Sequence, residues 1–542
     1  MPATPAPTAP AHEAYARREW LAAAQHFESS ATTGTLTADD VTAWSRAAWW
    51  LGRPDEALTL AERAYGQLRD AGREEDAIAT ALRIALVRAT RGDVTVGAAW
   101  WRRAQGLLRD RPDGPLHAYS TYLDTSLGLT TDGSTWSPSS VARLAELSRS
   151  VRSPEVEILS QVVSGMAAIA TGDMARGFEL LDEAMLGVVT DELEPEWGGD
   201  VLCTTIHACH ELADLRRMSD WTRSTEAWAA RFGSDAVYAG VCRVHRLELR
   251  SIEGQWPAVE DDLVRECAAL EDGNAWIAGE GWYQLGELKR HQGDIAAARE
   301  AYGRARSCGI DPVPGEALLV LEEGAPGRAL SMVKYALEGR SPLARVRLLR
   351  PGTEIALAAA DLAIAHVWAE ELRGAARRWT SPGFAAWADA ADGMIALRDG
   401  RGDVAAAFFS AAVDYHHRHR QRCEHARALA WLAASYDASG NADAADHARD
   451  MAAEQFRTLG ALARVTVDVG GTPDTGPLTA REAEVLAAVA QGASNREVAE
   501  RLFISDKTVG RHLANIYVKL DVGTRTAAAA WWRDGAGARA RE

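Results

Sequence analysis

Three potential metal ligands occur at helical spacing in the segment VLCTTIHACHEL. Cys203, His207 and His210 stand at positions i, i+4 and i+7, which would place them on one face of a helix. A thiolate and two imidazoles at this spacing can bind zinc, but the sequence offers no obvious ligand to complete the site. Because buried thiols and hydrogen-bonded histidines are the commoner origin of such a pattern, we predict no metal site here.

A second group of histidines and a cysteine lies in YHHRHRQRCEH. His416, His419 and Cys423 alternate with arginines, which favours a solvated helix end or an interdomain surface. Motifs of other catalytic sites are missing: the sequence has no Gly-Lys dipeptide for a Walker phosphate loop, no GxGxxG and no evident Ser, His and Asp set. We therefore expect no enzyme activity and no cofactor.

A patterned basic segment, SNREVAERLFISDKTVGRHLANIYVKL, runs from Ser494 to Leu520 in an otherwise acidic chain. The formal net charge of the 542 residues is −17. Residues 477–542 hold ten basic and eight acidic residues, a net of +2, which leaves −19 for the remainder. Only this last part of the chain is therefore expected to contact nucleic acid, since the acidic part repels it.

Capping residues divide the basic part into four predicted helices, at 479–490, 495–502, 506–520 and 524–533. Thr479 and Ser494 each precede a glutamate by three residues, which is the capping-box pattern, and Ser505 and Thr524 can cap the other two helices. The tight turn between the second and third helices predicts a helix-turn-helix. If the apolar side of the third helix is buried, its other side presents long donors and small polar groups: Lys507, Thr508, Arg511, His512, Asn515 and Lys519. Such a face suits the major groove, and the alternative is a small helical bundle with a charged surface.

The same segment closely resembles the LuxR-type helix-turn-helix domain. The resemblance is carried by LTARE-EVL from Leu478, GASNREVAERL from Gly492, ISDKTV from Ile504, the spaced residues His512, Asn515, Ile516, Lys519 and Leu520, and Val522 with Arg525. It implies a four-helix domain at 478–534 that binds double-stranded DNA as a dimer, commonly through the last helix. Trp531 and Trp532 are then candidates for the dimer contact, the alternative being packing against the helical repeats. The candidate DNA-binding residues are Asn495, Arg496, Ser505, Lys507, Thr508, Arg511, His512, Asn515 and Lys519. One departure is Gly510, which stands where the family often has a basic residue and shifts base reading toward Arg511.

The remaining 12–464 region is rich in Ala and Leu at helical spacing, with recurrent turn signals. Strong signals centre on Gly52, Gly92, Gly172, Gly254, Gly293, Gly402 and Gly440, and weaker ones on Arg18, Asp132, Asp214, Gly324 and Asp361. Their period near forty predicts one helix pair per unit, and such units must stack because one alone cannot bury its apolar face. We therefore predict an all-α protein with an α-solenoid of about twelve hairpins. The unit AWWLGRPDEALTLAERAYGQL resembles a tetratricopeptide repeat, although its spacing is longer than in that family.

These features predict five regions: a disordered lead (1–11), a repeat region for sensing or interaction (12–464), a linker (465–477), the DNA-binding domain (478–534) and a disordered tail (535–542). Six scattered cysteines without a CxxC pair, no secretory signal and no long apolar run favour a cytoplasmic protein without a membrane anchor. The whole chain is similar to large MalT-like LuxR regulators, with QFRTLGALAR at 455–464 resembling their last repeat, but it lacks their ATPase signature.

We expect a transcriptional regulator whose repeats sense a small molecule, a peptide or a protein, and whose acidic part restrains the basic domain until then. Alternatives are a repeat scaffold whose main target is a protein, and an enzyme or small-molecule carrier built in the repeats. The effector and the operator sequence are not predictable from these features.

Overall fold

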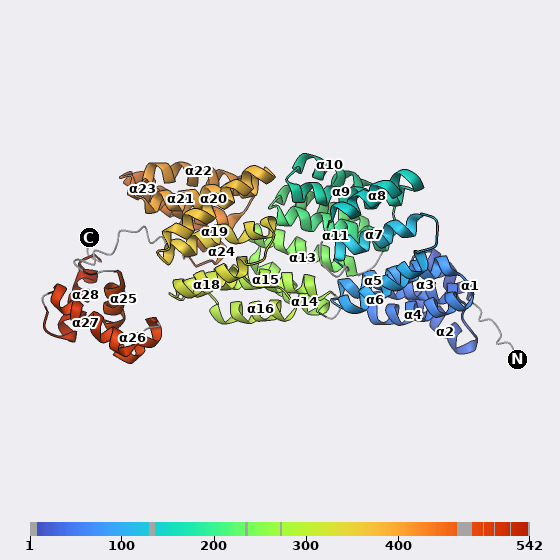
Figure 1. The fold of residues 1–542 in the computed structure, drawn as a ribbon, viewed down its shortest axis with the longest axis horizontal. Helices are drawn as coiled ribbons and strands as arrows, with labels where there is room; N and C mark the ends of the chain where they lie inside the picture. The colour runs from blue at the N-terminus through green and yellow to red at the C-terminus, as the bar shows by residue number, and fades with distance from the viewer. Residues whose placement is uncertain are drawn as a thin grey trace. The chain divides into compact units, whose positions relative to one another are not determined.

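The computed structural model describes residues 8–128, 136–232, 237–271, 274–462, 478, 480–490, 493–502, 505–520 and 522–539 (Figure 1). These residues form 28 α-helices and no β-strand, which confirms the predicted all-α class. The chain divides into two compact units, Met1–Val467 and Asp468–Glu542. Within the described ranges, every helix is too short or too polar to cross a bilayer.

The first unit contains twelve consecutive helical hairpins, as the period near forty predicted. The first helices of the hairpins are α1 (Ala9–Ala16), α3 (Ala38–Trp50), α5 (Glu74–Thr90), α7 (Pro115–Leu127), α9 (Pro154–Thr171), α11 (Pro195–Glu211), α13 (Val237–Ile252), α15 (Ala275–Gln292), α17 (Gly315–Glu322), α19 (Pro342–Ala358), α21 (Pro382–Arg398) and α23 (Arg422–Ala438). The second helices are α2 (Trp20–Thr33), α4 (Pro54–Asp70), α6 (Val94–Leu108), α8 (Pro138–Val151), α10 (Met174–Val189), α12 (Leu215–Ala230), α14 (Trp256–Leu270), α16 (Ile295–Ser307), α18 (Pro326–Leu337), α20 (Leu362–Trp379), α22 (Gly402–Arg418) and α24 (Ala442–Leu459).

The hairpins stack in two layers. Most odd-numbered helices pack on the next odd-numbered helix as well as on their sequence neighbours, so they form the inner layer. Helices α5, α9 and α21 accordingly bury residues around most of their circumference. Even-numbered helices such as α4 and α12 bury a single apolar stripe and present charged residues outside, which is the pattern of a surface helix.

The hairpin turns use the chemistry that the sequence predicted. Six of the seven strong turn glycines have a positive φ, between 67° at Gly52 and 98° at Gly172, and Arg18 has a φ of 60°. An Asp or Asn then caps several of the next helices; the side chain of Asp173, for example, accepts a hydrogen bond from the amide of Arg176 at 3.2 Å. Asp132 lies outside the described residues.

The prediction for Gly402 was wrong. The residue with positive φ in that turn is Gly400, whereas Gly402 is the first residue of α22. A Cβ on Gly402 would lie 2.7 Å from the carbonyl oxygen of Ser435, so glycine is required there for close packing between two helices.

Two terminal boundaries also differ from the prediction. Helix α1 begins at Ala9, inside the predicted disordered lead, and the last helix continues to Arg539, inside the predicted disordered tail. A run of Ala and a helix-starting Pro10 favour helix in the first case. The predicted linker at 465–477 and the capping residue Thr479 lie outside the described residues.

Hairpins far apart in sequence contact each other in the first unit. The indole of Trp379 donates to the carbonyl oxygen of Ile169 at 2.9 Å, and the hydroxyl of Ser381 donates to that of Leu212 at 2.6 Å. Further along, the amide of Leu462 donates to the carbonyl oxygen of His291 at 2.9 Å. These contacts join α9–α11 to α20–α21 and the end of α15 to the end of α24, so the stack folds back on itself.

Candidate nucleic-acid interface

The second unit contains the four short helices that the sequence predicted. They are α25 (Ala480–Ala490), α26 (Asn495–Leu502), α27 (Asp506–Leu520) and α28 (Arg525–Arg539). Ser494 and Glu497 form a capping box: the Ser494 amide donates to the Glu497 carboxylate at 2.6 Å, and the Glu497 amide donates to the Ser494 hydroxyl at 3.3 Å. Ser505 and Thr524 accept from the amides three residues later, at 3.1 Å each. These caps fix where α26, α27 and α28 begin.

One small apolar core clamps the inner side of α27. Val509 and Ile516 are fully buried and Leu513 is nearly so, and together they face apolar residues of α25, α26 and α28. The buried members outside α27 are Leu478, Val485, Leu486, Ala488, Val489, Ala493, Val498, Ala499, Ala528 and Ala529. Since side chains at i, i+4 and i+7 of α27 are held inside, its opposite side is fixed outward.

The outward side of α27 carries the predicted polar face. Lys507, Arg511 and Asn515 are exposed and follow one another at four-residue intervals, so they lie in one row along the helix. Thr508 and His512 beside them are half-buried. A Cβ added to Gly510 would meet no atom within 4 Å, so this position leaves open space next to the row.

Two other predicted DNA-binding residues have partners within the unit. The Lys519 amine lies 2.6 Å from the Glu482 carboxylate, which is 5% exposed and belongs to α25. The side-chain oxygen of Asn495 accepts a hydrogen bond from Arg525 at 2.6 Å. The first contact joins α27 to α25, and the second joins α28 to α26. Spacing along one helix cannot reveal contacts of this kind.

Trp531 and Trp532, the predicted dimer residues, lie on α28. Both are partly buried and pack against the apolar core of their own unit. A residual exposed part remains on each. The structure thus gives these indoles a packing role within the domain.

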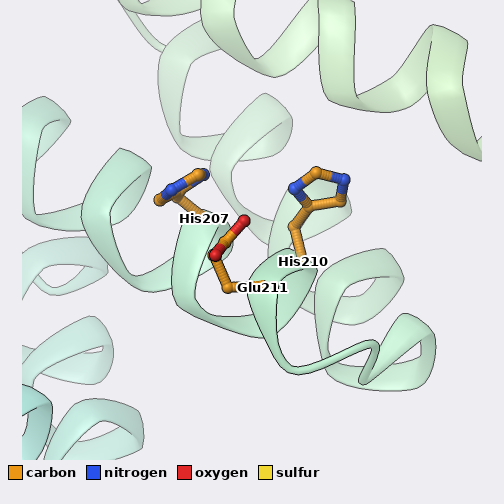
Figure 2. Close-up of side chains that lie close together, drawn as sticks. All are labelled: His207, His210 and Glu211. Atoms are coloured by element: carbon orange, nitrogen blue, oxygen red, sulfur yellow. The ribbon is translucent and has the colours of Figure 1, made fainter. Parts of the chain in front are cut away.

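The first of the two candidate metal-ligand groups is rearranged in the structure. His207, His210 and Glu211, all from the last turns of α11, bring one ligand atom each within 4.8 Å of one another (Figure 2). Cys203, the third predicted member, instead packs against an apolar cluster of α13–α15. Arg347 from α19 lies 2.9 Å from the His210 Nε2 and 3.1 Å from the Glu211 carboxylate. A guanidinium at these distances disfavours a divalent cation in the same place, because like charges repel.

Burial and neighbouring charges together set the titration of this group. Burial and Arg347 lower the pKa of His210, but the charge of the Glu248 carboxylate and its hydrogen bond outweigh them, so the pKa is raised. Burial lowers the pKa of His207 to about 4. Sequence reasoning missed Glu248 and Arg347, because they come from α13 and α19, and it missed Glu211 although this residue follows His210 on α11.

The prediction for the second group was wrong at two of its three residues. His416 is 3% exposed and Cys423 is 9% exposed, so neither lies on a solvated surface. The turn between α22 and α23 returns Gln421 to His416, and the His416 Nδ1 lies 2.7 Å from the Gln421 side-chain oxygen. This hydrogen bond satisfies the imidazole and allows its burial.

Comparisons with known proteins concern mainly the second unit. Residues 476–532 match the family described as "Bacterial regulatory proteins, luxR family". The transcriptional regulatory protein LiaR of Bacillus subtilis is 52% identical over 54 residues, which are 10% of this chain and 26% of LiaR. The CsgBAC operon transcriptional regulatory protein of Escherichia coli is 49% identical over 57 residues, again 10% of this chain and 26% of that protein. The chain thus spans about a quarter of the length of the curated relatives it matches.

Solved structures of low similarity extend over the repeats. The crystal structure of the APC/C hetero-tetramer Cut9-Hcn1 shares 13% identity at a TM-score of 0.38, covering 97% of this chain and 95% of that one. Yeast Tom70 shares 9% identity at a TM-score of 0.27, covering 82% and 97%. The four short helices, the clamped third helix and the matched family agree on one assignment: residues 476–532 are a LuxR-family helix-turn-helix domain.

Proposed function

We propose that this protein is a cytoplasmic transcriptional regulator whose C-terminal unit binds operator DNA and whose helical repeats respond to a ligand or a partner. The observation that carries the proposal is the exposed row of Lys507, Arg511 and Asn515 on a helix whose other side is held in a sealed core. Guanidinium, ammonium and amide groups match the donors and acceptors at base edges and phosphates. The role of the matched family supports the same conclusion.

In this proposal α27 enters the major groove and the other contacts position it. Arg511 and Asn515 read base edges, while Lys507 meets a phosphate. The ion pair of Lys519 and the hydrogen bond of Asn495 suggest that these two residues act mainly by holding the domain together. The remaining proposed contacts come from side chains near the starts of α26 and α27 and along α27: Arg496, Ser505, Thr508 and His512.

We also propose that two copies bind a two-half-site operator through α28, on which Trp531 and Trp532 are placed. A symmetric pair of domains would present two recognition helices about one turn of DNA apart. The exposed parts of the two indoles are the surface available for that contact.

Replacing Arg511 by Ala should cost about 1–3 kcal/mol of specific binding, because a bidentate base contact is lost. Lys507→Ala is the matched control, since it removes a neighbouring exposed cation that we assign to phosphate. It should weaken binding to all duplexes alike. It should also reduce the slope of the logarithm of the binding constant against the logarithm of the salt concentration by about one. Fluorescence anisotropy with a duplex selected by the full chain, and with its scrambled version, measures both. Unchanged binding by both variants would contradict the α27 interface.

The charge contrast between the acidic repeats and the basic domain supports restraint of DNA binding in the resting protein. The isolated fragment 468–542 should then bind the selected duplex more tightly than the full chain does. Added salt should reduce the difference in DNA affinity between the fragment and the full chain, because salt screens the attraction between exposed charges. Equal affinities of fragment and full chain at every salt concentration would exclude restraint.

A further inference from the structure

The first unit contains a polar cavity of ≈ 560 Å³ that DNA binding does not use. Its walls come mostly from inner-layer helices, namely α11, α13, α15, α19 and α23. The contacts between distant hairpins, such as Ser381 with Leu212 and Leu462 with His291, bring these walls together. The volume lies within the range of about 300–1,000 Å³ that is usual for small-molecule sites.

The cations that line this cavity are all engaged by carboxylates. The pairs are Arg347 with Glu211 at 3.1 Å, Arg290 with Glu287 at 2.8 Å, Arg350 with Glu424 at 2.9 Å, Arg340 with Asp311 at 2.7 Å, and His210 with Glu248 at 2.8 Å. Because each guanidinium among the described lining residues already has an anionic partner, these residues offer no free cation to an anionic ligand.

One lining carboxylate is left over. Glu280, in the middle of α15, makes no hydrogen bond or ion pair with any of the residues that the structure describes. Burial raises the pKa of Glu280, and the neighbouring carboxylates Glu248 and Glu211 raise it further against the opposing effect of His210 and Arg347. Glu280 is half-buried, and although His210 and Arg347 lie near enough to lower its pKa, neither makes an ion pair with it, so this position favours a cation that contacts the carboxylate directly.

Aromatic side chains lie around the same cavity. Tyr283, one turn after Glu280 on α15, lines it together with Trp387 and Tyr415. The Tyr283 hydroxyl has no hydrogen-bond partner among the described residues. Faces of such rings attract organic cations and cover their carbon atoms, whereas a bare metal ion prefers several oxygen ligands.

We propose that this cavity binds a small organic ammonium ion, with its amine against Glu280 and its carbon body against the aromatic side chains. That such an ammonium ion is the effector of the regulator rests on the sensing role proposed above. Binding itself requires only the cavity. A bound ammonium ion would link α15 to the helices around the cavity, because its amine would pair with Glu280 on α15 while its carbon body packs on aromatic side chains of the other walls.

Phenethylammonium is a suitable probe, with the neutral 2-phenylethanol as its matched control. Isothermal titration calorimetry with the full chain should show binding of the ammonium ion, and Glu280→Gln should weaken it at least about tenfold, since a desolvated charge pair is lost. Glu300→Gln removes the same charge from an exposed position on α16 and should leave the affinity unchanged. The alcohol should bind more weakly than the ammonium ion.

Equal binding of the probe by the wild type and Glu280→Gln would overturn the proposal. Equal binding of the alcohol, or no binding of the ammonium ion by the wild type, would overturn it as well. Affinity of the same proteins for the selected duplex is measured in parallel. Loss of amine binding with intact DNA binding would leave the regulator role standing, so the two proposals fail separately.

Discussion

Lowering the pH from 7 to 5 is expected to destabilise the helical-repeat unit, with about 4 kcal/mol coming from His245 and His416 alone, because buried histidines stay neutral in the folded chain. His207 and His291, whose pKa values burial lowers to about 4 and about 3, act in the same direction. His245 and His416 are each 3% exposed. Burial lowers the pKa of His245 to about 3 and that of His416 to about 4. In the unfolded chain both titrate near a pKa of about 6.5, so each contributes about 2 kcal/mol over this interval.

The sign follows from which state takes up protons. Below the pKa that a histidine has in the unfolded chain, the unfolded chain binds a proton and the folded chain does not. The free energy of unfolding therefore falls as the pH drops toward the pKa of the histidine in the folded chain. Around His245, the Glu248 carboxylate opposes the shift while His210 and His207 reinforce it. The raised pKa of His210 acts in the opposite direction, since its contribution is present at low pH and is lost as the pH rises. Glu248 and Glu287, whose pKa values are lowered to about 2, lose their contributions only at more acidic pH.

Urea unfolding at both pH values, followed by circular dichroism, measures this loss. His245→Gln should recover about 2 kcal/mol of it, since one of the proton-linked histidines is removed. His26→Gln is the control, because it removes an imidazole from an exposed position on α2 and leaves the buried histidines in place. The same unfolding midpoint at pH 7 and pH 5 would contradict the expectation.

Local features of the fold were predictable where chemistry lies within a few residues. A glycine followed by Asp or Asn marks a helix end and the next helix start, and the structure bears this out at Gly172 with Asp173 and at Gly293 with Asp294. Arg18 takes the same backbone conformation without being glycine, and repeat spacing still located it. Gly402 shows the limit, because a glycine needed for helix packing resembles one needed for a turn.

The candidate sites differ in the same way. The row on α27 follows from four-residue spacing within one helix, so Lys507, Arg511 and Asn515 were predictable. The charged cavity was not, since Arg347 reaches His210 across 137 residues of sequence and no periodicity links them. Such contacts arise only when hairpins far apart in sequence stack against each other. The burial of His416 was missed for a different reason, because its partner Gln421 is close in sequence but is reached through the turn between α22 and α23 rather than along a helix face.

Replacing Arg290 by Met should lower the stability of the first unit by about 3–5 kcal/mol, because it leaves buried carboxylates without their partner. Arg290 is 3% exposed at the end of α15. Its guanidinium lies 2.8 Å from the Glu287 carboxylate and 2.6 Å from that of Glu322. The Tyr302 hydroxyl also donates to Glu287, at 2.5 Å. Met fills a similar volume, so the loss reflects charge rather than a cavity.

Arg299→Met is the matched control, since Arg299 pairs with Glu323 next to Glu322 but is itself 56% exposed. An exposed pair of this kind contributes at most about 1 kcal/mol, and its removal should leave the unfolding midpoint nearly unchanged. Chemical denaturation of the two variants at pH 7 compares a buried and an exposed pair that anchor adjacent residues at the end of α17. If both variants unfolded at the same denaturant concentration, the buried network would contribute no more than a surface ion pair. The inner layer would then be held by its apolar contacts alone. A larger loss for Arg290→Met would instead show that the buried carboxylates Glu287 and Glu322 need the guanidinium as their counter-charge.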